Sequence, residues 1–124
     1  MKLNQINLTV SDVPRARAFL EKYFGLRPVG EAHKNFQMLV DDDDLVLTLM
    51  GVGRSNEVSY PKTFHLGFIR PREADVYELN GRLRDNGFEV DAPSWRHGHC
   101  TFYLEAPGGF TIAVSADIGD RHAH

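Results

Sequence analysis

Apolar and polar side chains alternate along residues 5–10, with all the apolar ones on one face of an extended chain. This period of two predicts a strand that is buried on one face only. Residues 11–14 then supply the capping side chain and the early proline of a helix start. Apolar residues recur at helical spacing over residues 16–24 and Gly25 follows, so the sequence predicts an amphipathic helix that ends there.

The second half of the chain repeats this order. Residues 64–69 predict a strand, residues 71–75 open a second helix, and Asn86-Gly87 closes it. Further strands are expected after each helix, near residues 35–40, 45–50, 101–105 and 110–115. The shared spacing of helix start, apolar stripe and helix end indicates a half-length internal repeat.

A run of four aspartates, residues 41–44, separates two of the expected strands. The run lacks the alternating acids and the glycine of a calcium-binding loop, so we interpret it as a solvated turn rather than a metal loop.

Length and composition narrow the function classes. The 124 residues correspond to one domain, and 42% hydrophobic with 25% charged residues is typical of a globular protein. A net charge of −3 provides no basic field for nucleic acid. The chain has one cysteine, Cys100, no secretion signal, and no apolar run approaching the roughly 20 residues of a membrane helix. We therefore expect a cytoplasmic protein without nucleic-acid or membrane partners.

Three stretches carry a family resemblance: residues 5–12 with the helix that follows, residues 64–68 and residues 101–113. The last stretch resembles an aromatic strand, an Asp-Pro-Asp-Gly turn and a closing strand, with Ala106 and Gly108 in place of the two acids. On these stretches the sequence is identified as a member of the vicinal oxygen chelate superfamily. That group contains glyoxalase I, extradiol dioxygenases, fosfomycin-resistance transferases and bleomycin-resistance binding proteins.

The resemblance implies an α+β fold of two βαβββ modules whose curled mixed sheets enclose a groove. Module one is expected over about residues 1–57 and module two over about residues 63–117, within a single domain of residues 1–120. A polar tail is expected at residues 118–124. The resemblance to small members of this family implies a homodimer. The unpaired strand edges of isolated half-sheets lead to the same expectation. The groove would form between modules of one chain or of two chains.

The polar face of each expected strand would line this groove and bind a small organic molecule. The expected ligand-binding residues are Gln5, Asn7, Thr9, Thr48, His65, Trp95, Thr101, Tyr103 and Ala113. Trp95, in an expected loop over residues 93–98, and Tyr103 would stack on a planar, largely uncharged compound. Phe36 would form a third aromatic wall if its strand register points inward.

Metal-using relatives place ligands at four positions that correspond here to Gln5, Thr48, His65 and Ala113. Ala113 has no donor atom, and a catalytic divalent ion needs about three protein ligands, so no metal or other cofactor is expected. The alternative is one divalent ion held by Gln5, His65 and Glu105.

A second group of possible ligands is His97 and His99 beside Cys100, but their spacing matches no zinc pattern, and we interpret them as loop residues.

Three functions remain open. The first is a metal-free binding protein of the bleomycin-resistance type, which would sequester a planar compound and confer antibiotic resistance. The alternative is a metal-dependent lyase, isomerase or dioxygenase with an atypical ligand set. A metal-free enzyme with His65 as general base is the third. Metal content separates the first from the second.

Overall fold

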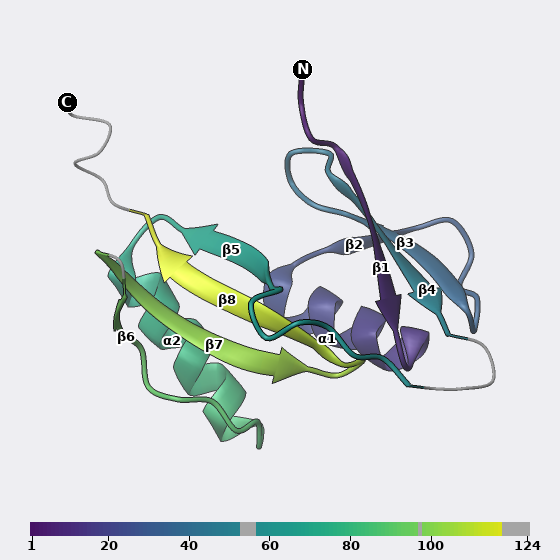
Figure 1. Cartoon of the computed structure of the whole chain (residues 1–124). Helices are drawn as coiled ribbons and strands as arrows, with labels where there is room; N and C mark the ends of the chain where they lie inside the picture. The colour runs from purple at the N-terminus through teal and green to yellow at the C-terminus, as the bar shows by residue number, and fades with distance from the viewer. Residues whose placement is uncertain (53–56, 97, 118–124) are drawn as a thin grey trace. The chain divides into compact units, whose positions relative to one another are not determined.

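The computed structural model describes residues 1–52, 57–96 and 98–117 (Figure 1). The elements are β1 (Gln5–Val10), α1 (Val13–Phe24), β2 (Arg27–Val29), β3 (Phe36–Val40), β4 (Val46–Gly51), β5 (Leu66–Arg70), α2 (Glu73–Asp85), β6 (Ser94–Arg96), β7 (His99–Ala106) and β8 (Phe110–Ala116). Strand, helix and three strands thus occur twice, which confirms the predicted α+β fold with two βαβββ repeats.

The chain divides into two compact units. The first unit contains Met1–Lys62 and the turn Ala106–Phe110, and the second contains Thr63–Glu105 and the described residues from Thr111 onward. The expected polar tail, residues 118–124, lies outside the described residues.

The first unit contains a mixed four-stranded sheet in the order β1-β4-β3-β2. The β1 and β4 strands are parallel, whereas β3 runs antiparallel to both of its neighbours. Leu8 and Val10 of β1 are buried, while Gln5, Asn7 and Thr9 are exposed. The alternation in the sequence therefore predicted correctly which face of this strand is buried.

Helix α1 begins and ends where the sequence predicts. The Asp12 carboxylate accepts a hydrogen bond from the backbone N–H of Arg15 at 3.0 Å, and Pro14 lies in the first turn. Gly25 ends the helix in the left-handed conformation with φ 71°, which glycine adopts without strain. Phe19 and Leu20 are among the α1 side chains buried in the core of this unit.

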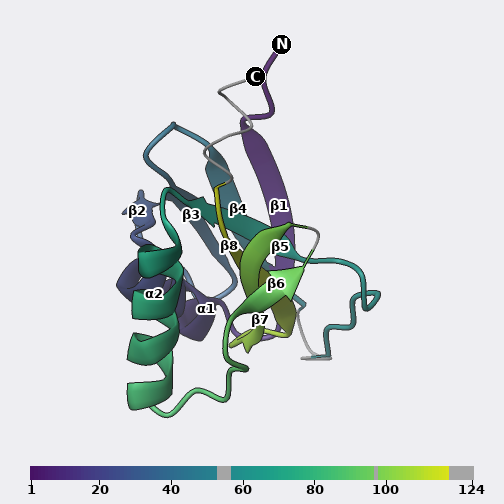
Figure 2. The same ribbon diagram turned by 90° about the vertical axis from the view of Figure 1, so that its left-hand side faces the viewer.

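The second unit repeats the arrangement with a sheet in the order β5-β8-β7-β6, and α2 runs along one side of it (Figures 1 and 2). Val76, Leu79 and Leu83 of α2 are buried, as are Phe102 and Ile112 of the sheet. Among the described residues of this unit, no helix lies on the opposite face of the sheet.

Two short strands were not predicted. Arg27–Val29 forms β2, where the sequence suggested no strand, and Ser94–Arg96 forms β6, where a loop was expected. All three residues of each strand are exposed, so neither strand shows the apolar alternation on which prediction depends. The interpretation of His99 as a loop residue is also wrong, because β7 begins at His99.

The aspartate run forms the expected turn. The Asp41 carboxylate accepts hydrogen bonds from the backbone N–H groups of Asp43 and Leu45, at 2.8 and 2.9 Å. This carboxylate therefore stabilises the turn between β3 and β4.

Among the residues that the structure describes, no helix is both long and apolar enough to span a membrane.

Candidate functional site

The helix-free face of the second unit's sheet carries three of the nine expected ligand-binding residues, Thr101, Tyr103 and Ala113, together with Glu105 of the alternative metal set. We call it the second-sheet face; it contains Thr101, Tyr103, Glu105, Thr111, Ala113 and Ser115. Two side-chain pairs join its central strands: the hydroxyls of Thr101 and Ser115 lie 3.0 Å apart, and Thr111 donates to the Glu105 carboxylate at 2.6 Å. These pairs hold the face in one register and take up part of the hydrogen-bonding capacity of Glu105.

Tyr103 is the centre of a three-residue cluster on this face. The His65 ring meets the Tyr103 ring edge-on, with centroids 5.6 Å apart and planes at 84°. The Arg96 guanidinium carbon lies 5.8 Å from the Tyr103 ring centroid, within cation–π range. Tyr103 is 38% exposed and both neighbours are exposed, so the cluster is accessible within its unit.

His65 precedes β5 by one residue, and its position fixes one tautomer. Its Nδ1 lies 3.2 Å from the backbone carbonyl of Thr63. A carbonyl only accepts, so Nδ1 carries the hydrogen when this bond forms, and Nε2 of the neutral ring is then an acceptor. His65 therefore presents a nitrogen that can accept a hydrogen bond from a ligand.

The floor beside this cluster is made of small residues. Ala113 is 5% exposed and pairs with Gly67 of β5, beside which no atom lies within 4 Å of an added Cβ. A side chain added at Gly67 would therefore meet open space beside Ala113.

The donor set at the four positions implied by the resemblance does not fit a divalent ion. Ala113 has no donor, and the Thr48 side chain is 4% exposed. In the alternative set, the Glu105 carboxylate accepts the Thr111 hydroxyl. Across the described ranges, no three His, Cys, Asp or Glu side chains gather as a metal centre would require.

The exposed face of the first unit's sheet is mixed in polarity. Gln5, Asn7 and Thr9 are exposed as expected, but Thr48, which pairs with Asn7, is buried. The alternation of side chains along the strand correctly predicted the face on which Thr48 lies, but it could not predict that Thr48 is buried there. Phe36 pairs with Met50, which pairs with Thr9, so the register places Phe36 on the predicted face.

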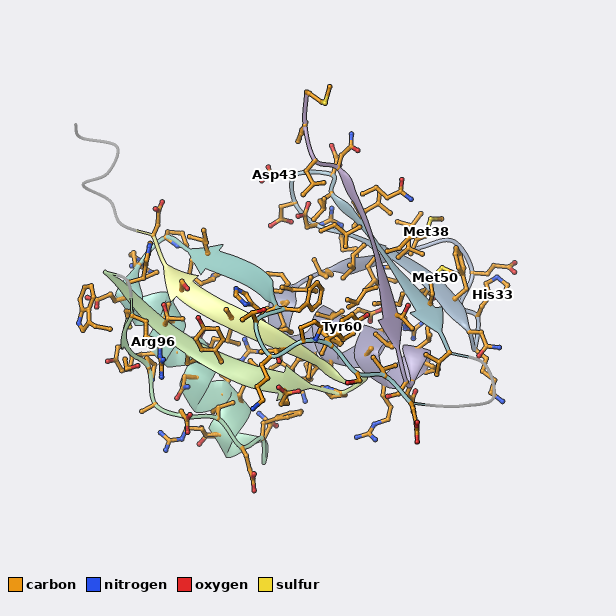
Figure 3. The ribbon with its side chains drawn as sticks, viewed as in Figure 1. His33, Met38, Asp43, Met50, Tyr60 and Arg96 are labelled. Carbon is orange, nitrogen blue, oxygen red and sulfur yellow. The ribbon has the colours of Figure 1, made fainter. Side chains whose placement is uncertain are left out.

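Apolar side chains extend this face. Phe36 and Met50 are each 38% exposed, and the His33 ring meets Phe36 edge-on at 6.3 Å. Figure 3 shows Met38 and Met50 on neighbouring strands with His33 beside them. The sequence analysis identified Phe36 but did not single out Met38 or His33.

Trp95 does not share a face with Tyr103. It pairs with Cys100 across the β6–β7 ladder, and directly paired residues point to the same side of a sheet. Cys100 contacts residues of α2, so Trp95 belongs to the helix-covered side, at its periphery, and is 70% exposed. The structure thus separates the two aromatic walls predicted for one ligand and places Arg96 beside Tyr103 instead.

The two described members of the His-x-His-Cys group, which the sequence analysis did not favour as a metal site, do not form a cluster. His97 lies outside the described residues, and His99 and Cys100 are adjacent strand residues that point to opposite faces. The His99 Nδ1 lies 3.1 Å from the backbone carbonyl of Ala116.

Cys100 is a buried free thiol. Burial raises the pKa of the Cys100 thiol, the charge of Glu73 raises it further, and a hydrogen bond from the Tyr77 hydroxyl opposes both. The thiolate form is therefore disfavoured, and this residue fits a structural role.

A depression of about 810 Å³ follows the edge of β7 within the second unit. It is lined by Arg84, Phe88, Glu89, Val90, Asp91, Tyr103, Leu104, Glu105 and Thr111. Asn80 donates to the backbone carbonyl of Asp91 at 2.8 Å and so fastens the segment after α2 to the helix. Sequence reasoning missed this segment because its residues show no strand or helix period. Tyr103 contributes both to this depression and to the cluster with His65 and Arg96.

Comparison with known proteins places this geometry in a family. Residues 2–114 match the model of the Glyoxalase/Bleomycin resistance protein/Dioxygenase superfamily. No curated protein matches the sequence. A possible glyoxalase from Bacillus cereus is 50% identical, with a TM-score of 0.85 over 93% of this chain and 98% of that chain.

Two more distant structures share the fold alone. A lactoylglutathione lyase from Agrobacterium tumefaciens is 20% identical, with a TM-score of 0.73 over 93% of this chain and 92% of its own. A mutant of FosX, a fosfomycin resistance protein from Listeria monocytogenes complexed with Mn(II) and 1S,2S-dihydroxypropylphosphonic acid, is 18% identical. Its TM-score is 0.78, over 99% of this chain and 98% of that chain. The chain belongs to the glyoxalase/bleomycin resistance protein/dioxygenase superfamily.

Proposed function

We propose that this protein is a metal-free small-molecule binding protein of the bleomycin-resistance type, which holds a planar organic compound on the second-sheet face. The observation that carries the proposal is Ala113, a residue without a donor atom at the position where metal-using relatives supply a charged ligand. A hard dication needs that negative charge. The accessible His65–Tyr103–Arg96 cluster offers a ring, a cation and a hydrogen-bond acceptor to an organic ligand instead.

Metal content tests this proposal directly. We expect the purified protein to contain well under one equivalent of Zn, Fe, Mn, Ni or Co by mass spectrometry. Added metal should not raise the melting temperature, because a ligand that binds only the folded state must stabilise it. One bound equivalent that is lost in His65→Ala would overturn the proposal.

The variant Ala113→Glu serves as the matched comparison. It introduces a carboxylate opposite Gly67, whose missing side chain leaves open space on this face. We expect this variant to bind Mn(II) or Zn(II) measurably more tightly than the wild type, and the double variant with His65→Ala to lose the gain. Equal metal binding by wild type and Ala113→Glu would contradict the role assigned to Ala113.

A metal-dependent lyase, isomerase or dioxygenase is the second candidate. It is favoured by the 50% identity to a protein described as a possible glyoxalase. Stoichiometric metal in the wild type, together with turnover of a substrate, would support this candidate over the first.

The proposal includes a homodimer in the cytoplasm. Strand β5 is an edge strand of the second unit's sheet, and such an edge is commonly covered by a partner. A monomer at tens of micromolar in sedimentation analysis would overturn the dimer. The cytoplasmic location stays a prediction from the single cysteine.

A further inference from the structure

We infer that the compound bound on the second-sheet face is an organic acid, whose anionic group is recognised by Arg96. The inference rests on the proposed function and specifies its ligand class. It starts from the register of β6, in which Arg96 pairs with His99 and therefore points to the side of Tyr103.

The Arg96 guanidinium is oriented but its hydrogen-bond donors are unfilled. In the part of the chain that the structure describes, it contacts the Tyr103 ring and makes no ion pair or hydrogen bond. Other arginines are paired: Arg27 binds Asp42 and Arg72 binds Asp75, each at 3.0 Å. An arginine whose guanidinium group lies over an aromatic ring, with its N–H groups not bonded to other side chains, is suited to bidentate binding of a carboxylate or phosphonate.

The neighbouring groups define where the acid group would lie. His65 is on the other side of the cluster and offers an acceptor nitrogen, whereas Glu105 carries a negative charge two residues beyond Tyr103. Repulsion from Glu105 disfavours an anion at that end of the face, so the acid group is expected at the Arg96 end. An O–H or N–H group on the ligand would then lie toward His65.

This ligand class differs from the largely uncharged compound that the sequence suggests. The difference has a structural cause, since the expected loop over residues 93–98 contains a strand at Ser94–Arg96. The register of that strand places Arg96, rather than Trp95, on the face of Tyr103.

Isothermal titration calorimetry with matched acid and amide pairs tests the inference. The probes are 4-hydroxybenzoate with 4-hydroxybenzamide, and indole-3-carboxylate with indole-3-carboxamide. We expect the wild type to bind at least one acid about tenfold or more tightly than its amide, because a hydrogen bond to a charged group is stronger than a neutral one. Raising the salt concentration should reduce this preference.

Two arginine variants locate the effect. Arg96→Gln should lose the preference for the acid while it binds the amide within about twofold of the wild type. Arg70→Gln is the matched control, because Arg70 is an exposed residue of the same sheet that pairs with Ala116 on the helix-covered side. It should keep the preference, and circular dichroism will verify that both variants fold.

The outcomes separate this inference from the proposed function. An acid preference that survives in Arg96→Gln, or amide binding as tight as acid binding, would overturn the inference and leave metal-free binding in place. Failure of every acid to bind at millimolar concentration would overturn it as well. Stoichiometric metal in the wild type would instead overturn the proposed function. The preference for acids and its dependence on Arg96 could still be measured in that case.

Discussion

Replacing Gly108 by alanine tests how closely the turn Ala106–Phe110 packs on the first unit. Gly108 has a φ of 113°, a conformation that side-chain-bearing residues rarely adopt. A Cβ at this position would lie 3.1 Å from the Cβ of Val10 and 3.3 Å from the Cβ of Ala16. Both neighbours are fully buried, and their Cβ atoms cannot move without the backbone.

Two terms set the magnitude. Backbone strain at a positive φ costs about 1–3 kcal/mol, and overpacking of a filled core costs about 1–3 kcal/mol. The hydrogen bond from the backbone N–H of Ser11 to the Gly108 carbonyl, 2.9 Å long, limits how far the turn can shift to relieve the contact. We therefore expect Gly108→Ala to lower the free energy of unfolding by about 2–6 kcal/mol, a large part of the usual 5–15 kcal/mol.

Two further glycines separate the terms. Gly109 also has a positive φ, 88°, but an added Cβ would approach Val58 only to 3.4 Å, so Gly109→Ala should show the strain of about 1–3 kcal/mol without the overpacking. Gly81 lies inside α2 with open space around it, so Gly81→Ala should stabilise by about 0.5–1 kcal/mol.

Urea unfolding followed by circular dichroism measures all three variants. If Gly108→Ala fails to fold at all, the loss seen in Gly109→Ala still tests the strain term. A change below about 0.5 kcal/mol in Gly108→Ala, or an equal loss in Gly108→Ala and Gly109→Ala, would refute the packing argument.

Three other predictions concern single side chains. The hydrogen bond from Arg72 lowers the pKa of Asp75, so this carboxylate stabilises the fold at any pH above its unfolded pKa of about 4, and this contribution is lost as the pH falls through the lowered folded pKa. The melting temperature of Asp75→Asn should therefore lie below that of the wild type at pH 7 and approach it in strong acid. A difference in melting temperature that does not change with pH would contradict this assignment. The buried Cys100, whose pKa is raised, should react with a disulfide reagent only at the rate of unfolding, and rapid labelling of the native protein would show that the thiol is accessible. Trp95→Ala should leave ligand affinity within about twofold, whereas Tyr103→Leu should weaken it about tenfold, because only Tyr103 lies on the second-sheet face; calorimetry distinguishes the two, and the reverse order would exclude this face as the site.

Periodicity predicted the elements that bury apolar residues. The stripe over residues 16–24 and the alternation over residues 5–10 gave α1 and β1 with their buried faces, because burial on one side leaves a period in the sequence. The start of α1 at Asp12 and its end at Gly25 could be predicted because local backbone chemistry sets both.

The site was harder to predict because it depends on a strand without that period. Each residue of β6 is exposed, so nothing in the sequence shows that Ser94–Arg96 is extended or how it pairs. A shift of one residue in register moves every side chain to the other face of a sheet. A loop was expected at these residues, so Trp95 was predicted to share a ligand with Tyr103, whereas the register of the strand places Arg96 on that side.

The Tyr60 side chain lies against β1, the edge strand of the first unit (Figure 3). Its hydroxyl accepts from the backbone N–H of Thr9 at 3.0 Å and donates to the Thr9 carbonyl at 2.7 Å. One phenol thus occupies the two backbone groups with which Thr9 would extend the sheet. Any chain that added to this edge would have to bond before Thr9, at Gln5 and Asn7, since alternate residues of a strand direct their backbone groups to the same side. Tyr60 therefore limits how far another strand could pair along the β1 edge.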